Sequence, residues 1–302
     1  MSAPRPLLGV LFIALANALG GVSFVMQKVA LEGLEPGMIA ALRHLIALPP
    51  ILVWARLRGA RLSAFSRGEL LRLACLGTFA FGLPMLMGII GVGLASASNG
   101  AILVLIEPVT ILLLAWALLG ERIGGLKILG VFLGMVGALF IVLETTSTEG
   151  LFQGDAFLGN VILVVHALLW GLYTPLVRPL SQRRDALAIS AWTLLFSLIL
   201  LLPYAGWELR TWEPNEALGS ALLWTAALGI GVSFASTVLW VAAVRHLEAS
   251  KIAPFIFVQP LVGVLVGVLW LGESLSTPAV VGSVLVALGC ALAVRSGGGG
   301  AE

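Results

Sequence analysis

The sequence predicts an all-α polytopic membrane protein in which ten transmembrane helices form two inverted five-helix repeats. Hydrophobic residues make up 60% of the 302 residues and charged residues 11%, whereas soluble domains contain roughly 45–50% and 25% of these classes. The apolar runs are long enough to cross a bilayer as helices. One pattern of residues also occurs in both halves of the chain.

Ten apolar segments of helical length follow one another with short connections. They cover roughly 7–29, 37–57, 70–92, 97–119, 124–143, 156–177, 186–204, 217–243, 250–271 and 277–295. Between the fifth and the sixth segment lies the polar, unpatterned connection 144–155. These lengths leave no room for a separate soluble domain between the segments.

The strongest sign of duplication is one stretch that occurs twice. Residues 107–121 read EPVTILLLAWALLGE and residues 259–273 read QPLVGVLVGVLWLGE, so an offset of 152 aligns the proline and the closing Gly-Glu. Further residues match without a gap: Ala97-Ser98 with Ala249-Ser250, Gly130 with Gly282, Gly137 with Gly289, and, at an offset of 150, Gly21 with Gly171 and Lys28 with Arg178. We therefore expect a first repeat at 1–145, a connecting loop at 146–155, a second repeat at 156–296 and a disordered tail at 297–302.

The basic residues predict how the helices cross the membrane. With a cytoplasmic N-terminus, fourteen of the seventeen Lys and Arg lie on the cytoplasmic side, as the positive-inside rule requires. Lys28 and Arg210 lie outside, Arg43 lies within a span, and the outer loops carry acidic residues. The fourteen are Arg5, Arg56, Arg58, Arg61, Arg67, Arg72, Arg122, Lys127, Arg178, Arg183, Arg184, Arg245, Lys251 and Arg295. Both termini are therefore expected in the cytoplasm.

An odd number of spans in each repeat makes the second repeat enter the membrane in the opposite sense to the first. Two inverted copies create a pseudo-two-fold axis in the membrane plane, with a central site that can open to either side in turn. This symmetry favours a transporter over a scaffold or an enzyme.

The sequence lacks the signals of several other functions. Cys75 and Cys290 lie in apolar runs without disulfide or metal-ligand spacing, and no P-loop or basic aromatic patch is present. We therefore expect no cofactor, no metal and no nucleic-acid partner. The segments 21–24 and 231–234 both read GVSF and resemble a nucleophilic serine motif with His166 as its base. The second glycine of that motif is missing, so an intramembrane enzyme is the least favoured alternative.

Taken together, these motifs resemble the EamA-type branch of the drug/metabolite transporter superfamily. The resemblance lies in two five-span halves, in Trp170-Gly171 in the first helix of the second half, and in the polar-Pro pair followed by Leu-Gly-Glu in each fourth helix. The first half departs from the pattern, with Gly20-Gly21 in place of Trp-Gly. Within the family, the chain is most similar to the amino-acid exporters, including those for aromatic amino acids, which implies a bacterial inner-membrane protein.

Two polar-Pro pairs lie near the middle of equivalent spans. Glu107 precedes Pro108, and its counterpart Gln259 precedes Pro260. One interpretation is structural, because proline leaves a helix carbonyl without its donor and either side chain could satisfy that backbone. The alternative is functional, because a carboxyl group at membrane depth can couple transport to protons.

Arg43 and His44 lie in the second span, and Arg43 is the cation placed farthest inside any span. Its guanidinium is matched to a carboxylate, so it could bind a substrate carboxylate. It could also pair with Glu107 or extend its charge towards the outer surface.

The sixth span carries His166, Trp170 and Tyr173 on one helix face. Such a face suits a cavity that stacks a planar side chain, although ordinary helix packing would also explain it. In the equivalent first span, Asn17, Phe24 and Gln27 offer a polar and aromatic complement.

These observations predict a secondary transporter of small organic metabolites that exports amino acids by alternating access. The alternative within transport is a drug or metabolite exporter coupled to protons through Glu107. The expected partners are the substrate and the lipid bilayer, and the pattern is compatible with a monomer.

Overall fold

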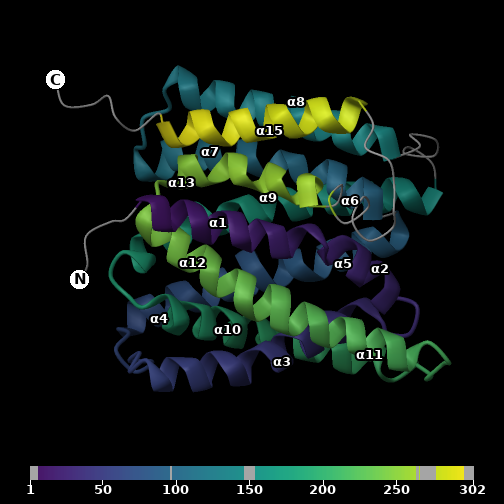
Figure 1. The fold of residues 1–302 in the computed structure, drawn as a ribbon. Helices are drawn as coiled ribbons and strands as arrows, with labels where there is room; N and C mark the ends of the chain where they lie inside the picture. Colours follow the sequence, from purple (N-terminus) through teal and green to yellow (C-terminus); the bar gives the residue numbers. More distant parts are fainter. Residues whose placement is uncertain (1–5, 96, 146–153, 263–264, 266–276, 296–302) are drawn as a thin grey trace.

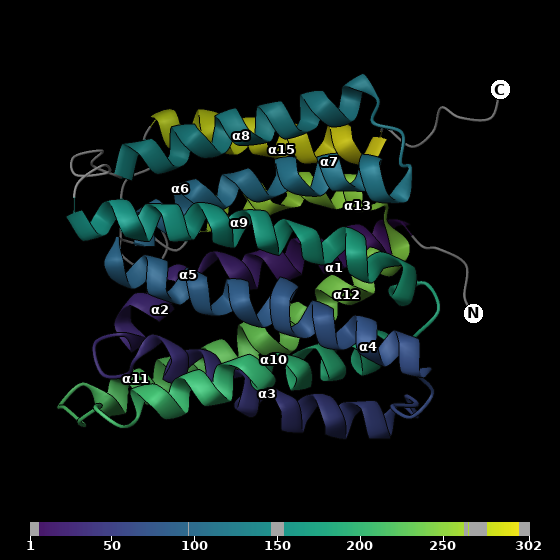
Figure 2. The ribbon, with the colours of Figure 1, turned by 180° about the vertical axis from the view of Figure 1, so that it is seen from behind.

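The computed structural model describes residues 6–95, 97–145, 154–262, 265 and 277–295, and these residues form a bundle of helices that lie side by side (Figures 1 and 2). In the described ranges all regular secondary structure is helical. The elements are α1 (Pro6–Gly21), α2 (Ser23–Ala30), α3 (Pro36–Leu57), α4 (Arg67–Cys75), η1 (Leu76–Gly82), α5 (Leu83–Leu94), α6 (Ala97–Leu103), η2 (Val104–Ile106), α7 (Glu107–Leu119), α8 (Gly125–Thr145), α9 (Gly154–Ser181), α10 (Ala186–Glu208), α11 (Leu218–Ala227), η3 (Leu228–Ser236), α12 (Thr237–His246), α13 (Ala249–Ile252), η4 (Ala253–Phe257) and α15 (Thr277–Arg295).

Six helical segments of the described chain are long and apolar enough to cross a membrane. They are Pro6–Ala30, Pro36–Leu57, Arg67–Leu94, Asp155–Ser181, Ala186–Glu208 and Leu218–His246. Four shorter apolar segments are Val104–Leu119, Gly125–Ile141, Ala249–Val262 and Val280–Arg295. Each of these segments overlaps one of the spans that the sequence predicts, and the four shorter segments cover their predicted spans only in part. The predicted tail at 297–302 and most of the predicted loop lie outside the described residues.

The outer surface of the bundle is rich in large apolar side chains. Leu113, Trp116, Phe132, Ile199 and Leu223 are each more than half exposed, with Leu223 at 68%. A soluble monomer rarely exposes apolar patches larger than a few hundred Å², so this surface fits a hydrocarbon environment. The chain is therefore an integral membrane protein.

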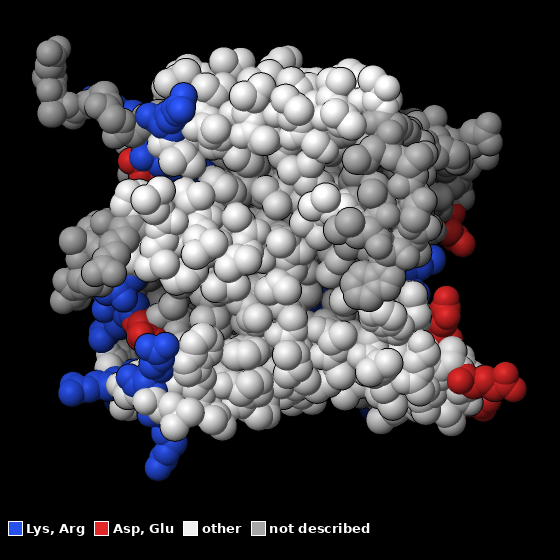
Figure 3. Space-filling view, viewed as in Figure 1, with Lys and Arg blue, Asp and Glu red and all other residues white. Residues whose placement is uncertain are grey.

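Charged residues gather at the two ends of the bundle (Figure 3). Most of the Lys and Arg on the face in view lie at the end where α1 begins and α15 ends, and most of the Asp and Glu lie at the other end. The end at which α1 begins is called the basic end below. The middle of the same face carries almost no charge, as expected for a surface between two aqueous sides.

Two spans contain a π-helical segment at the same place in each half. η1 begins at Leu76 and η3 at Leu228, which are 152 residues apart. A π-helical turn holds one residue more than an α-helical turn, and such bulges often occur at functional sites. Phe81 and Ser233 lie in these two segments at equivalent positions.

Helices α8 and α15 pack against each other through reciprocal glycine contacts, and both views show them side by side along one edge of the bundle (Figures 1 and 2). A Cβ atom on Gly130 would lie 2.7 Å from the carbonyl oxygen of Gly289, and one on Gly137 would lie 2.5 Å from that of Gly282. Gly130 is equivalent to Gly282, and Gly137 to Gly289. Each contact thus recurs with the halves exchanged, as it would around a two-fold axis perpendicular to the helices.

The same reciprocity appears where the first helix of one half meets the fourth helix of the other. A Cβ atom on Gly21 would lie 2.7 Å from the carbonyl oxygen of Gln259, and one on Gly171 would lie 3.3 Å from that of Glu107. Two more contacts recur in this way. Gly9 meets His246 and Leu247, and its counterpart Gly159 meets Leu94 and Ala95. Gly77 meets Thr193 and Phe196, and its counterpart Gly229 meets Arg43 and Ile46. Thr193 is therefore the counterpart of Arg43.

We expect Gly137→Ala or Gly282→Ala to force α8 and α15 apart, because each added methyl group would meet a backbone carbonyl that cannot rotate away. The expected loss of stability is about 1–3 kcal/mol, measured by thermal unfolding in detergent micelles. Gly219→Ala is the matched control, because nothing lies within 4 Å of a Cβ atom there. Equal melting temperatures for all the variants would contradict the proposed importance of this contact.

Candidate functional site

A partly open cavity of about 100 Å³ lies between the helices, with room for several water molecules. Both halves of the chain contribute to its wall: α1, α2, α3, η1, α5, η2 and α7 from the first, and α9, η3, α12 and Gln259 from the second. Equivalent positions line it in pairs, such as Glu107 with Gln259 and Met85 with Thr237. The cavity therefore lies where the two halves meet.

Nine of the twelve candidate residues from the sequence line this cavity. They are Asn17, Phe24, Gln27, Arg43, Glu107, His166, Trp170, Tyr173 and Gln259. His44, Pro108 and Pro260 do not line it. His44 is fully buried behind the wall, where its Nδ1 lies 2.7 Å from the hydroxyl oxygen of Ser197.

Arg43 is almost completely buried, with 1% of its surface exposed. Its Nε donates a hydrogen bond of 2.8 Å to Ser233 Oγ on the other half of the chain. Its two terminal nitrogens have no hydrogen-bond partner within the described protein. No ion pair joins Arg43 to Glu107, although both line the cavity. The predicted alternative of an internal Arg43–Glu107 pair is therefore absent here.

Glu107 and Gln259 occupy equivalent positions, but only Gln259 has a side-chain partner. Gln259 Nε2 donates to Asn17 Oδ1 at 3.0 Å, and Asn17 Nδ2 in turn donates to the Ile13 carbonyl. The residue equivalent to Asn17 near Glu107 is Ala167, which has no polar side chain. Glu107 is 1% exposed, and its Oε1 has no hydrogen-bond partner in the described structure. The broken repeat therefore leaves a carboxyl oxygen unpaired at the cavity.

Aromatic rings form one wall of the cavity. His166 stacks on Trp170 with ring centroids 5.8 Å apart, and Phe81 lies 5.1 Å from Trp170 and 5.2 Å from Tyr173. His166 Nδ1 is 2.6 Å from the carbonyl oxygen of Pro84, which fixes the ring against α5. This arrangement offers a planar apolar surface to a molecule in the cavity.

Three residues at or beside the cavity were not among the predicted site residues: Phe81, Ser233 and Trp240. Phe81 and Ser233 lie in the π-helical segments and occupy equivalent positions. Ser233 belongs to a GVSF segment considered as a nucleophile motif, and it instead accepts a hydrogen bond from Arg43. Trp240 donates to Thr174 Oγ1 at 3.0 Å. An offset of 152 pairs Phe81, which lines the cavity, with Ser233, which does not line it but bonds the cavity residue Arg43.

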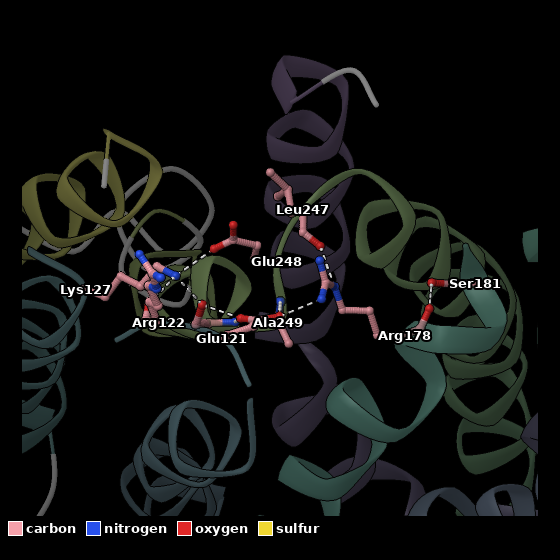
Figure 4. A network of polar contacts seen from close by, with 9 residues as sticks. Glu121, Arg122, Lys127, Arg178, Ser181, Leu247, Glu248 and Ala249 are labelled. Carbon is pink, nitrogen blue, oxygen red and sulfur yellow. Dashed lines mark hydrogen bonds and ion pairs between the residues drawn. The ribbon is translucent and has the colours of Figure 1, made fainter. Parts of the chain in front are cut away.

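A second polar cluster joins the two halves at the basic end of the bundle (Figure 4). Glu121 is 8% exposed and pairs with Arg178 at 2.8 Å. Its carboxylate also accepts hydrogen bonds from the backbone nitrogens of Ala249 at 3.0 Å and Ser250 at 2.9 Å. One carboxylate thus connects the end of α7 with α9 and the start of α13. The name Glu121 cluster is used below for Glu121, Lys127, Arg178, Glu248 and Ser250.

Lys127 extends the Glu121 cluster towards α8. Its Nζ donates to Glu248 Oε2 at 2.6 Å and to Ser250 Oγ at 2.7 Å. Burial alone would raise the pKa of Glu248, but the hydrogen bond and charge of Lys127 hold that pKa below its ordinary value. Glu248 is therefore ionised at neutral pH and keeps its bond to Lys127.

Comparison with known proteins agrees with this architecture. The sequence matches the EamA-like transporter family twice, over residues 7–143 and 157–295. An uncharacterized transporter of Archaeoglobus fulgidus is 27% identical over 255 residues, which cover 83% of this chain and 85% of that relative. The uncharacterized transporter YoaV of Bacillus subtilis is 24% identical over 296 residues, covering 94% of this chain and 95% of the relative.

One solved crystal structure superposes with a TM-score of 0.78, covering 94% of this chain and 97% of its own, at 17% identity. At that identity the similarity describes the fold alone. The two family matches together span nearly the whole sequence. The chain therefore belongs to the EamA-like transporter family.

Proposed function

We propose that this protein is a secondary transporter that exports amino acids by alternating access between two inverted repeats. The observation that carries the proposal is the guanidinium of Arg43, which is buried at the cavity with two unpartnered nitrogens. A buried cation without a counter-charge is costly, and a carboxylate that accepts hydrogen bonds from both terminal nitrogens would satisfy them.

The proposed architecture has ten transmembrane helices, with repeats at 1–145 and 156–296 and with both termini in the cytoplasm. The reciprocal glycine contacts support an axis in the membrane plane, because α8 and α15 pack with their equivalent glycines in antiparallel order. The basic end of the bundle supports the orientation, since it is the end where α1 begins. The bacterial inner membrane is the proposed location.

The Glu121 cluster gives the alternating mechanism a physical basis. It joins α7 of the first half to α9 and α13 of the second at the basic end. Movement of one half against the other at this end would separate Glu121 from Arg178 and from the α13 amides. We propose that the Glu121 cluster holds the cavity shut towards the cytoplasm and breaks when that side opens.

A second candidate is a drug or metabolite exporter coupled to protons through Glu107. The unpartnered Oε1 of Glu107 favours it, because a buried carboxyl group can exchange a proton when the cavity opens to water. Transport driven by an imposed pH gradient in proteoliposomes separates the two candidates. If transport is coupled to protons, the pH gradient should drive substrate flux against its concentration gradient. Glu107→Gln should then abolish this gradient-driven flux but leave substrate exchange intact.

Arg43→Gln should weaken transport of amino acids by roughly 1.5–3 kcal/mol, because a charged hydrogen bond to the carboxylate is lost. Arg43→Lys should lie between the wild type and Arg43→Gln, because lysine keeps the charge without the planar fork. Transport of amino-acid amides, which lack the carboxylate, should be reduced far less by either substitution. Competition assays in proteoliposomes measure this difference, with the exposed residue Arg56 changed to Gln as the control. An equal loss for acids and amides would assign Arg43 a structural role.

The proposed orientation can be tested by cysteine labelling in a protein whose Cys75 and Cys290 are replaced by serine. A single cysteine at position 63 should react with a membrane-impermeant thiol reagent from the inside, and one at position 146 from the outside. Labelling of both positions from one side of the membrane is incompatible with the ten-span orientation.

Glu121→Gln should open the basic end, because the neutral amide pairs poorly with Arg178 and cannot accept from both α13 amides. A cysteine in place of the cavity residue Thr237 should then label about 10-fold faster from the cytoplasmic side in inverted vesicles. The exposed residue Glu213, changed to Gln, provides the control. Unchanged labelling would show that the Glu121 cluster does not restrict access.

A further inference from the structure

The cavity contains two unpaired groups that are complementary in charge. Six buried side-chain polar atoms in the described structure lack a hydrogen-bond partner, and three of them belong to Arg43 and Glu107. Both residues are 1% exposed, and both line the same cavity. Two groups of opposite charge thus line one cavity without pairing, and each can take a partner from a bound molecule.

The two groups reach the cavity from different directions. Arg43 lies on α3 and Glu107 at the start of α7, and these helices lie on opposite sides of α1 and α9 in both views (Figures 1 and 2). The surroundings of the two groups differ. Ser233 holds the guanidinium through Nε, which leaves the two terminal nitrogens free, and α7 places Pro108 in its first turn directly after Glu107.

The repeat shows that the unpartnered carboxyl group of Glu107 is specific to the first half. At the equivalent place in the second half, Gln259 is neutral and is paired with Asn17. At the place equivalent to Arg43, Thr193 is neutral, and its Oγ1 lies 3.4 Å from the hydroxyl oxygen of Tyr173. Both unpaired charges therefore belong to the first half, and the second half supplies the rings of His166, Trp170 and Tyr173 to the same cavity.

We infer that the cavity selects zwitterions, with the anionic group of the substrate on Arg43 and its ammonium group on Glu107, and with an apolar or aromatic body against the ring wall. This inference rests on the proposed transport function and adds Glu107 as a residue that determines specificity. A zwitterion would give both buried groups a charged partner at once. A molecule with one charge would leave the other group buried without a counter-charge, which costs free energy.

Four compounds that share one phenyl ring test the inference: phenylalanine, phenylalaninamide, phenethylamine and 3-phenylpropionate. Their competition with labelled phenylalanine is measured by counterflow in proteoliposomes, which needs no ion gradient. For the wild type, the three analogues should compete roughly 10- to 100-fold less well than phenylalanine, as expected for loss of one charged hydrogen bond. The order in which the four compounds compete therefore tests both the Arg43 end and the Glu107 end of the site.

The variants distinguish the two ends. Glu107→Gln should reduce the preference for phenylalanine over 3-phenylpropionate to about onefold to threefold, while the preference over phenethylamine remains. Arg43→Gln should instead reduce the preference for phenylalanine over phenethylamine, while the preference over 3-phenylpropionate remains. Glu107→Asp, which keeps the charge, should restore part of the lost preference. Glu213→Gln and Arg56→Gln, at exposed sites, are controls, and thermal unfolding verifies that each variant is folded.

The outcomes separate this inference from the proposed function. If the wild type exchanges phenylalanine but all four compounds compete equally, amino-acid transport stands and zwitterion selection is wrong. If the folded Glu107→Gln protein binds phenylalanine and 3-phenylpropionate more weakly by the same factor, Glu107 does not bind the ammonium group. If the wild type exchanges no amino acid, the proposed amino-acid export itself fails.

Discussion

The close approach of backbone to backbone at equivalent glycines is the constraint on which the arrangement of this bundle depends. In a bilayer, helices gain little from the hydrophobic effect, so tight packing and hydrogen bonds determine where they lie. Gly130 and Gly137 meet Gly289 and Gly282, and Gly21 and Gly171 bring the first helix of each half against the fourth helix of the other. These contacts place the cavity between the halves.

Symmetry of the backbone is combined with asymmetry of the side chains. Equivalent positions carry Arg43 and Thr193, Glu107 and Gln259, and Gly20 and Trp170. The first half thus provides both charges, while the second half provides most of the rings. A duplicated scaffold can therefore bind a molecule that is not itself symmetric.

Much of the fold was predictable because membrane insertion constrains the sequence strongly. The predicted spans agree with the helices within a few residues, apart from the ninth, of which residues 263–264 and 266–271 lie outside the described residues. Polar residues are rare in apolar spans, which made Arg43, Glu107, His166 and Asn17 candidates, and all four line the cavity. Phe81 was not distinguishable, since an aromatic residue in an apolar run carries no signal. His44 does not line the cavity but contacts Ser197, and a partner 153 residues away could not be recognised from the sequence.

The unpaired charges at the cavity have a kinetic consequence. In any alternating cycle the site must pass through a state closed to both sides, and the empty site would pass through it with Arg43 and Glu107 uncompensated. Each such charge at membrane depth costs several kcal/mol, which raises the barrier for the empty protein. If the site binds a zwitterion as proposed, the occupied site has both charges paired and crosses a lower barrier. On the proposed mechanism, one-for-one exchange of substrates is therefore faster than net flux, and the return of the empty protein limits the turnover rate.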